Sequence, residues 1–239
     1  VNAGNAVFVA SGNVREKILK AASHMMEAAE EDLELADGKV TVKGVPDLSK
    51  TLGEVAEFVN GKPGFTLPGD LEPGLQDLSY FTPKQAVYAN GTHLAEVEVD
   101  IETGYVKVLK YWTGHDCGML INPMTVEGQV LGGVAHGLGN ALFERMLYDE
   151  NAQPVTVNYG EYLIPLATDM PHVEQVHQET PTPQNPLGVK GAGEGGTIPA
   201  IAAIIGAIDN ALEPFGVRIS EAPITPPRLL ELIEAAKSK

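Results

Sequence analysis

Basic residues and cysteine are scarce in this 239-residue sequence. Lys and Arg together number 16 against 32 Asp and Glu, which gives a formal net charge of −16. Nucleic acids and anionic membrane surfaces are bound through clustered positive charge, so neither is an expected partner. The single cysteine, Cys117, excludes a disulfide within the chain and a cysteine-rich zinc site.

Long hydrophobic runs are also missing. No apolar run approaches the roughly 18 residues that a membrane-spanning helix needs, so we expect no transmembrane helix. A signal peptide is not visible either, and the expected location is therefore the cytoplasm. The sequence begins at Val1 rather than Met, which is typical of a fragment or a processed piece.

The chain does contain ample material for a core. Hydrophobic residues make up 44% of it and charged residues 20%, which is a globular composition. The hydrophobic periodicity predicts the α+β class, with mixed sheets and packed helices. A Pro- and Gly-rich loop near 61–76 is the candidate boundary if 1–239 forms two subdomains rather than one domain. The predicted helices cover 13–30 (capped by Asn13), 52–61, 123–145, 197–213 and 226–237, and the predicted strand pairs cover 33–44 and 93–114.

A glycine-rich stretch, "GVKGAGEGGTIPA" at 188–200, places the charged residue Glu194 between glycines. One interpretation is a tight turn that leads into a helix. A second is a dinucleotide site, because Gly191, Gly193 and Gly196 match G-x-G-x-x-G. That fingerprint needs a preceding strand, and the three prolines in "TPTPQNPLGVK" leave no room for a long regular one. We therefore reject the dinucleotide site.

The third interpretation of this loop is a catalytic carboxylate. Glu194 lies just before a predicted helix N-terminus, where negative charge is favoured. Glycines on both sides let a ligand come close, and a carboxylate placed in this way can serve as a general base. Lys190 is either its ion-pair partner or a surface charge.

The predicted helix 123–145 is unusually rich in glycine. Each glycine in a helix interior costs about 1 kcal/mol relative to alanine, so something must approach this helix closely. Another backbone or a flat ligand would both fit. His115 and Cys117 precede the helix, but no further residue at ligand spacing supports a metal site, so core or loop roles are expected for them. One narrow helix face carries Gln129, His136 and Asn140, with Gly132 and Gly133 between them.

Together these motifs resemble the molybdopterin-binding large subunit of the xanthine dehydrogenase family, the molybdenum hydroxylases. The matching segments are "LAEVEVDIETGYVKV", "HDCGMLINPMTVEGQVLGGVAHGLGNALFE", "EYLIPLATDMP" and "GVKGAGEGGT", in the family's order. Two departures stand out: His136 replaces the usual Gln, and Gly195-Gly196 replaces the Pro-Pro of the xanthine enzymes. With Gly195-Gly196, the loop is more similar to that of the carbon-monoxide-dehydrogenase-like bacterial branch.

The resemblance implies roles for individual residues. Glu194 would be the catalytic base beside molybdenum, and Gln129 would hydrogen-bond the dithiolene side of the pterin. A loop at the start of the chain would wrap backbone N–H groups around the cofactor, and small residues would leave room for it. The metal would be held through the pterin dithiolene, with no protein ligand. The implied cofactor-binding residues are Gln129, Val7, Phe8, Val9, Ala10, Ser11, Gly132, Gly133, Lys190 and Gly193.

The resemblance also implies a function. The chain would be the C-terminal molybdopterin-binding domain of an enzyme that hydroxylates or oxidises an aldehyde, an N-heteroaromatic compound or carbon monoxide. A non-catalytic scaffold or binding module that keeps the fold is the alternative. The family's subunit is much longer, so the isolated piece is expected to be inactive.

Cofactors and partners are implied in the same way. The cofactor would be molybdenum-molybdopterin in its cytosine dinucleotide form. Partners would be the N-terminal part of the large subunit, an iron–sulfur subunit and an FAD subunit. The expected assembly is a homodimer of heterotrimers.

Overall fold

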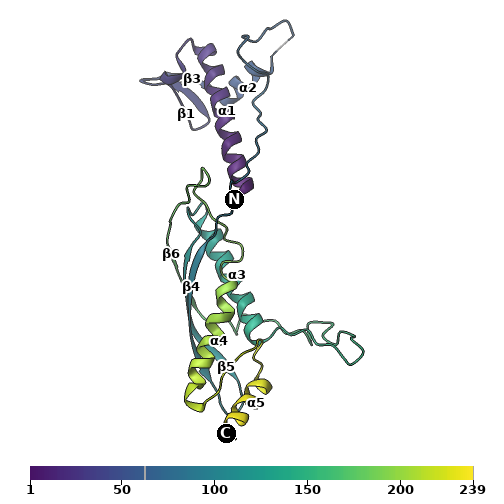
Figure 1. The fold of residues 1–239 in the computed structure, drawn as a ribbon. Coiled ribbons are helices and arrows are strands. Elements are labelled where there is room, and N and C mark those ends of the chain that lie inside the picture. Colours follow the sequence, from purple (N-terminus) through teal and green to yellow (C-terminus); the bar gives the residue numbers. More distant parts are fainter. Residues whose placement is uncertain (62, 239) are drawn as a thin grey trace. The chain divides into compact units, whose positions relative to one another are not determined.

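The chain forms two compact units, Val1–Lys84 (unit 1) and Gln85–Lys239 (unit 2), in a computed structural model that describes residues 1–61 and 63–238 (Figure 1). The boundary follows Lys84, whereas the expected Pro- and Gly-rich loop at 61–76 lies within unit 1. Apart from residue 62, which lies outside the described residues, that loop contains no helix or strand, as predicted. The α+β class predicted from the sequence is confirmed.

Unit 1 combines two helices with a small antiparallel sheet in the order β1-β2-β3. Asp37 and Gly38, with φ of 48° and 73°, form the predicted turn between β1 and β2. The core is apolar, and Val40, Val55 and Ala22 are fully buried in it. The elements are α1 (Asn2–Met26), η1 (Glu30–Asp32), β1 (Leu33–Ala36), β2 (Lys39–Val42), β3 (Val45–Thr51) and α2 (Leu52–Asn60).

The first helix differs from its prediction at both ends. It begins at Asn2 rather than at Asn13 and ends at Met26 rather than near residue 30. Asn13 is not a cap: it lies inside α1, and its side-chain amide donates to Asp77 and Ser79, each at 3.2 Å. The first turn is held by Asn5, whose backbone N–H and side-chain amide both donate to the Val1 carbonyl.

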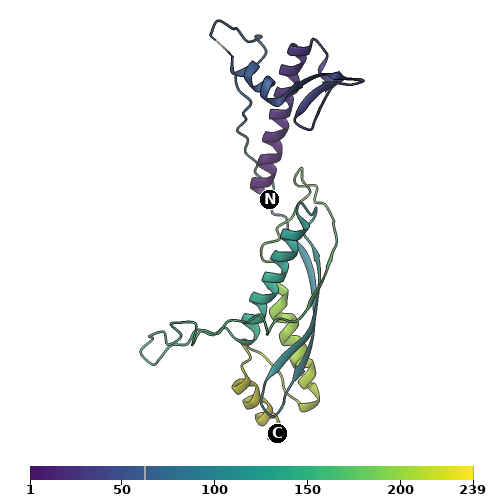
Figure 2. The same cartoon turned by 180° about the vertical axis from the view of Figure 1, so that it is seen from behind.

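Unit 2 is a three-stranded sheet with helices packed along one face, visible in both views (Figures 1 and 2). In the order β4-β5-β6, β4 and β5 are antiparallel and β6 runs parallel to β5. The predicted helices and the predicted strand pair of this unit are confirmed. The elements are β4 (Asn90–Val99), β5 (Val106–Asp116), α3 (Pro123–Leu142), β6 (Val173–His177), α4 (Ile198–Leu212), η2 (Glu213–Phe215) and α5 (Pro226–Lys237).

The core of unit 2 lies between β5 and the helices. Tyr111 of β5, Leu138 of α3 and Ile204 of α4 are almost fully buried there. The stretch Ile198–Phe215, with a mean hydropathy of 1.3, is long and apolar enough by composition to cross a membrane. One face of α4 packs against β4 and α3, and 22% of the stretch is buried.

Between α3 and β6, the segment 144–168 projects from unit 2 as an extended arm (Figure 1). A bridge between Tyr148 and Pro154 folds its tip back on itself. Many of its apolar side chains are exposed, which is typical of a surface that contacts another protein. The exposed apolar residues of the arm are Met146, Leu147, Tyr148, Val155, Val157, Tyr159, Leu163, Ile164 and Leu166.

Candidate active site

The glycine-rich loop and helix α3 meet at a hydrogen bond. Gln129 Nε2 of α3 donates to the carbonyl oxygen of Gly193 at 2.7 Å. Gly193 directly precedes Glu194, so this bond brings the predicted helix face and the predicted carboxylate to one place. Gln129 and Glu194 are both exposed.

Some of the glycines allow two backbones to touch. A Cβ added to Gly133 would lie 2.7 Å from the Cα of Gly196, and one added to Gly196 would overlap the Val130 carbonyl. Farther along α3, a Cβ at Gly137 would overlap Ala200 of α4. Close backbone packing therefore explains these positions. The expectation that Gly133 leaves room for a cofactor is wrong, because Gly196 fills that space.

Other glycines face open space. An added Cβ at Gly128 or Gly132, one turn apart on α3, would meet no atom within 4 Å. The same holds for Gly193 in the loop. Among the described residues, no atom lies where a side chain at these three positions would stand, so the edge of a flat ligand can approach the backbone from that side. The glycine-rich helix therefore has two explanations that apply to different positions. Backbone packing explains Gly133 and Gly137, whereas Gly128 and Gly132 leave space for a ligand.

Glu194 also begins helix α4. Its carbonyl oxygen accepts the backbone N–H of Thr197 at 3.0 Å and of Ile198 at 3.2 Å. These two bonds fix the main chain at position 194, while the carboxylate stays exposed beside the helix N-terminus. Negative charge on a ligand or a side chain is favoured at such an end.

Lys190 pairs with Asp116, not with Glu194. Its Nζ lies 3.3 Å from Asp116 Oδ1, and the two side chains are 11% and 14% exposed. Both alternatives for Lys190, a partner of Glu194 or a surface charge, are therefore wrong. The backbone N–H of Lys190 donates to the carbonyl of Cys117 at 2.7 Å, which joins the loop to the end of β5 a second time.

Asp116 is a site residue that the sequence analysis missed. Burial by itself would raise the pKa of its carboxyl, but hydrogen bonds from Thr180, Gly118 and Lys190 lower this pKa to about 2. Asp116 therefore carries a negative charge at neutral pH and anchors the loop electrostatically. Its position at the end of a predicted strand was visible in the sequence, but its partner lies 74 residues away.

His115 and Cys117 are buried, with 3% and 4% of their surface exposed, so the expected core roles are confirmed. The imidazole of His115 lies against Gly195, where a Cβ would overlap its Nε2 atom. Within residues 1–61 and 63–238, no cluster of three or more His, Cys, Asp or Glu side chains could hold a metal ion.

Residues Val7–Ser11 belong to unit 1 and lie inside helix α1. The expected loop of free backbone N–H groups is therefore wrong, because these groups donate within the helix. The groups that this segment exposes are side chains, among them those of Val7 and Phe8.

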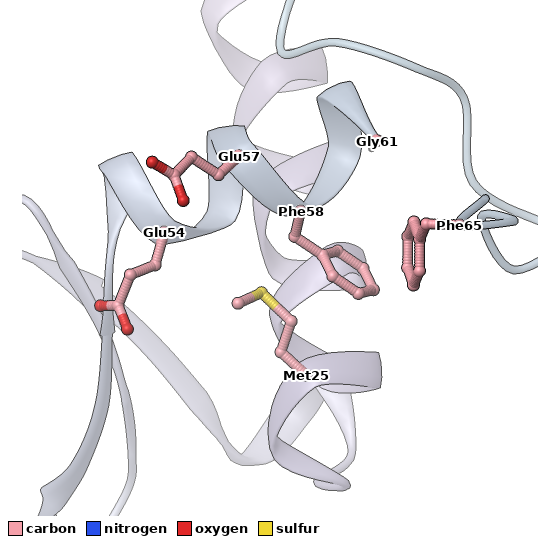
Figure 3. A pocket seen from close by; sticks show the side chains of 6 residues that line it. All are labelled: Met25, Glu54, Glu57, Phe58, Gly61 and Phe65. Atoms are coloured by element: carbon pink, nitrogen blue, oxygen red, sulfur yellow. The ribbon is translucent and has the colours of Figure 1, made fainter. Parts of the chain in front are cut away.

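Unit 1 also contains a cavity of about 340 Å³ beside α2 (Figure 3). Phe58 and Phe65 meet there edge to face, with ring centroids 5.5 Å apart. Met25 lies beside Phe58, and the carboxylates of Glu54 and Glu57 lie along one side. None of the residues implied by the family resemblance lines this cavity.

Comparison with known proteins gives consistent matches. The family described as the molybdopterin cofactor-binding domain matches residues 1–171. The large subunit of nicotine 6-hydroxylase from Paenarthrobacter nicotinovorans is 38% identical over 96% of this chain and 28% of its own length. The large chain of carbon monoxide dehydrogenase from Hydrogenophaga pseudoflava is 34% identical over 93% of this chain and 27% of its own length.

Among solved structures, the crystal structure of a Cu,Mo-CO dehydrogenase matches 98% of this chain and 29% of its own chain, with a TM-score of 0.86 and 31% identity. The chain thus spans less than a third of the length of these relatives. The likeness to carbon monoxide dehydrogenase agrees with the resemblance inferred from the glycines after Glu194.

Proposed function

Because this chain belongs to the molybdopterin cofactor-binding domain family, we propose that it is the C-terminal cofactor-binding part of a molybdenum hydroxylase in which Glu194 is the catalytic base. The observation that carries this proposal is the hydrogen bond from Gln129 to Gly193, which holds Glu194 beside the open glycine positions. The substrate would be a small molecule. The nicotine-hydroxylating relative favours an N-heteroaromatic compound over an aldehyde or carbon monoxide.

The residues fit a flat pterin cofactor. At Gly132 and Gly193 no atom lies within 4 Å of the place where a Cβ would stand, and a planar group can lie against such bare backbone. Gln129, which is bonded to Gly193 through its amide nitrogen, would offer its amide oxygen to a hydrogen-bond donor of the cofactor. The Lys190 ammonium is already paired with Asp116, so a contribution from it would come from the backbone. When bound, the molybdenum centre would supply a sink for the two electrons taken from the substrate.

The position of Glu194 supports the proposed role as a general base. Its carboxylate is exposed, its main chain is fixed by two hydrogen bonds to α4, and glycines flank it on both sides. A proton released at the reacting group would be accepted at a Glu194 carboxylate oxygen, close to the positive end of the α4 dipole. The hydrogen bond from Gln129 to Gly193 would keep this oxygen at a constant distance from the cofactor.

The rest of the assembly is also part of the proposal. The cofactor would be the cytosine dinucleotide form, and iron–sulfur and FAD subunits would carry the electrons away. The assembly would be a cytoplasmic homodimer of heterotrimers, in which 1–239 acts as one cofactor-binding domain. The exposed apolar side chains of the arm at 144–168 support extensive contacts with the N-terminal part of the large subunit or with partners. The isolated piece would be inactive, since one wall cannot enclose the cofactor.

The test uses the complete large subunit with its partners. Glu194→Gln keeps the size of the side chain and removes the base, so kcat/KM should fall by about 10² to 10⁴. Molybdenum and pterin content should stay at the level of the unchanged enzyme. The matched control is Glu102→Gln, an exposed glutamate in the turn after β4, which should leave kcat/KM unchanged. Normal turnover in the Glu194→Gln enzyme would show that Glu194 is not the catalytic base.

The scaffold alternative makes the opposite prediction. A complex that keeps its fold but contains no molybdenum or pterin, although both are supplied during expression, would favour a non-catalytic module.

A further inference from the structure

The imidazole of His115 occupies the space that a side chain at position 195 would need. A Cβ added to Gly195 would overlap His115 Nε2, and one added to Gly91 would lie 3.7 Å from the His115 Cδ2 atom. The ring is thus flanked by one glycine on β4 and one in the loop of Glu194. His115 is 3% exposed, so the ring has little freedom to move away.

The sheet face around His115 is polar although it is buried at Thr113 and His115 and half-buried at its other polar residues. His93 pairs with Thr113 and Thr113 with Gln175, while His115 pairs with His177, so all five side chains share one face. Within the described part of the chain, the buried side-chain nitrogen and oxygen atoms without a hydrogen-bond partner all belong to these five residues. Such atoms weaken a fold, and native proteins tend to keep them where they serve a function.

This polar face meets both halves of the candidate active site. Gln175 Nε2 donates to the carbonyl of Glu127 in α3 at 3.2 Å, two residues before Gln129. His115 contacts Gly195, the residue after Glu194. The same face therefore supports the helix that carries the amide and the loop that carries the carboxylate.

His115 is uncharged at neutral pH. Burial lowers the pKa of its imidazole, and the neighbouring His177 of β6 lowers it further, whereas Asp116 opposes the shift. His93 of β4 is also close to it, and Glu194 is the residue before Gly195, which the ring contacts. A neutral ring does not act on Glu194 by charge, so its influence is exerted through the shape of the loop.

We propose that His115 is a positioning residue for Glu194: its ring fills the place of a side chain at Gly195 and so fixes the direction in which the Glu194 carboxylate points. The effect on catalysis rests on the proposed role of Glu194 as the base. The contact between His115 and Gly195 does not depend on that role and can be tested separately.

The test is a double-mutant cycle in the complete, cofactor-loaded enzyme. Gly195→Ala forces the loop away from the ring, and a displacement of that kind should lower kcat by roughly 100-fold with KM and molybdenum content unchanged. His115→Ala frees the loop and should lower kcat by roughly tenfold. In the His115→Ala background, Gly195→Ala should change kcat by no more than about twofold, because the three atoms nearest to the new methyl group all belong to the removed ring.

Hydrogen exchange of the amides at 195–198 gives a readout that does not depend on turnover. Exchange should be faster in each single variant and should return toward the original rate in the double variant. The matched control is Gly191→Ala, where an added Cβ meets nothing within 4 Å, and it should leave this exchange unchanged. His115→Gln replaces His115→Ala if the latter does not fold.

The outcomes separate the two proposals. Additive effects of Gly195→Ala and His115→Ala on both kcat and exchange would overturn the positioning role. So would unchanged kcat and exchange in the folded His115 variant. A purely structural role would lower the amount of folded enzyme without changing kcat per molybdenum. If Glu194→Gln retains turnover, the base is refuted, while the exchange data still decide whether His115 holds the loop.

Discussion

Asp116 and Lys190 form an ion pair whose Oδ1 and Nζ atoms lie 3.3 Å apart, with most of both side chains out of contact with water. The pair joins the last residue of β5 to the loop that carries Glu194. Together with the backbone bond from Lys190 to Cys117, it fixes one side of this loop, while Gln129 fixes the other.

Lys190→Met should destabilise unit 2. The substitution keeps the length of the aliphatic chain but leaves the Asp116 carboxylate without its cation, which should cost about 1–3 kcal/mol of unfolding free energy. Urea unfolding followed by circular dichroism measures this change. The control is Lys107→Met at an exposed position of β5, which should fall within about 0.5 kcal/mol of the original chain. Equal stability of the two variants would show that the ion pair contributes nothing.

Stability should decrease as the pH falls from about 6.5 to about 4. Burial, and then the neighbouring His115, lower the pKa of His93 from 6.5 to about 4 in the folded chain. Between these pH values the His93 imidazole is protonated in the unfolded chain but remains neutral in the folded chain. Lowering the pH therefore favours unfolding. The melting temperature measured at several pH values tests this. His93→Gln should reduce the slope without abolishing it, because the pKa of His115 is lowered too. An unchanged slope in that variant would contradict the assignment.

Gly133→Ala should destabilise the packing of α3 on the loop. The added methyl group would lie 2.7 Å from the Gly196 backbone, so the two segments must separate, at a cost of about 1–3 kcal/mol. Gly206→Ala in α4 is the matched control, since nothing lies within 4 Å of its added Cβ. That control should gain about 0.5–1 kcal/mol from the better helix propensity of alanine. Thermal unfolding of the two variants should therefore shift in opposite directions, and a shift in the same direction would argue against the close contact.

Gln129→Ala should reduce cofactor retention more than stability. Gln129 is exposed, so losing its bond to Gly193 should cost no more than about 1.5 kcal/mol of unfolding free energy. In the complete enzyme, however, the loop would lose its tie to α3, and the molybdenum and pterin content per protein should fall. Metal analysis of the purified complex measures the effect. Gln153→Ala, an exposed amide on the arm, should retain full content; the same retention in Gln129→Ala would remove this residue from the site.

Much of the fold could be predicted because its signals are local. Apolar periodicity predicted α3, α4 and α5, and the Asp37-Gly38 turn predicted the first hairpin. The start of α1 was missed because "VNAGNAVFVASG" contains two glycines and no strong cap, and the helix is held instead by Asn5 bonding to Val1. β3 was missed because proline and aspartate interrupt its pattern.

The candidate site was only partly predictable. The motifs identified Glu194 and Gln129, but not which neighbour each glycine meets. Gly132 and Gly133 are adjacent in the sequence, yet one faces open space and the other touches Gly196. The partners Asp116 and Lys190 lie 74 residues apart, so no local pattern could pair them.

The contact between Gly133 and Gly196 has a consequence for which substitutions the chain can accept. Where two main chains touch, a side chain at either position would push the segments apart, so any larger residue there would widen the spacing between α3 and the loop that contains Glu194.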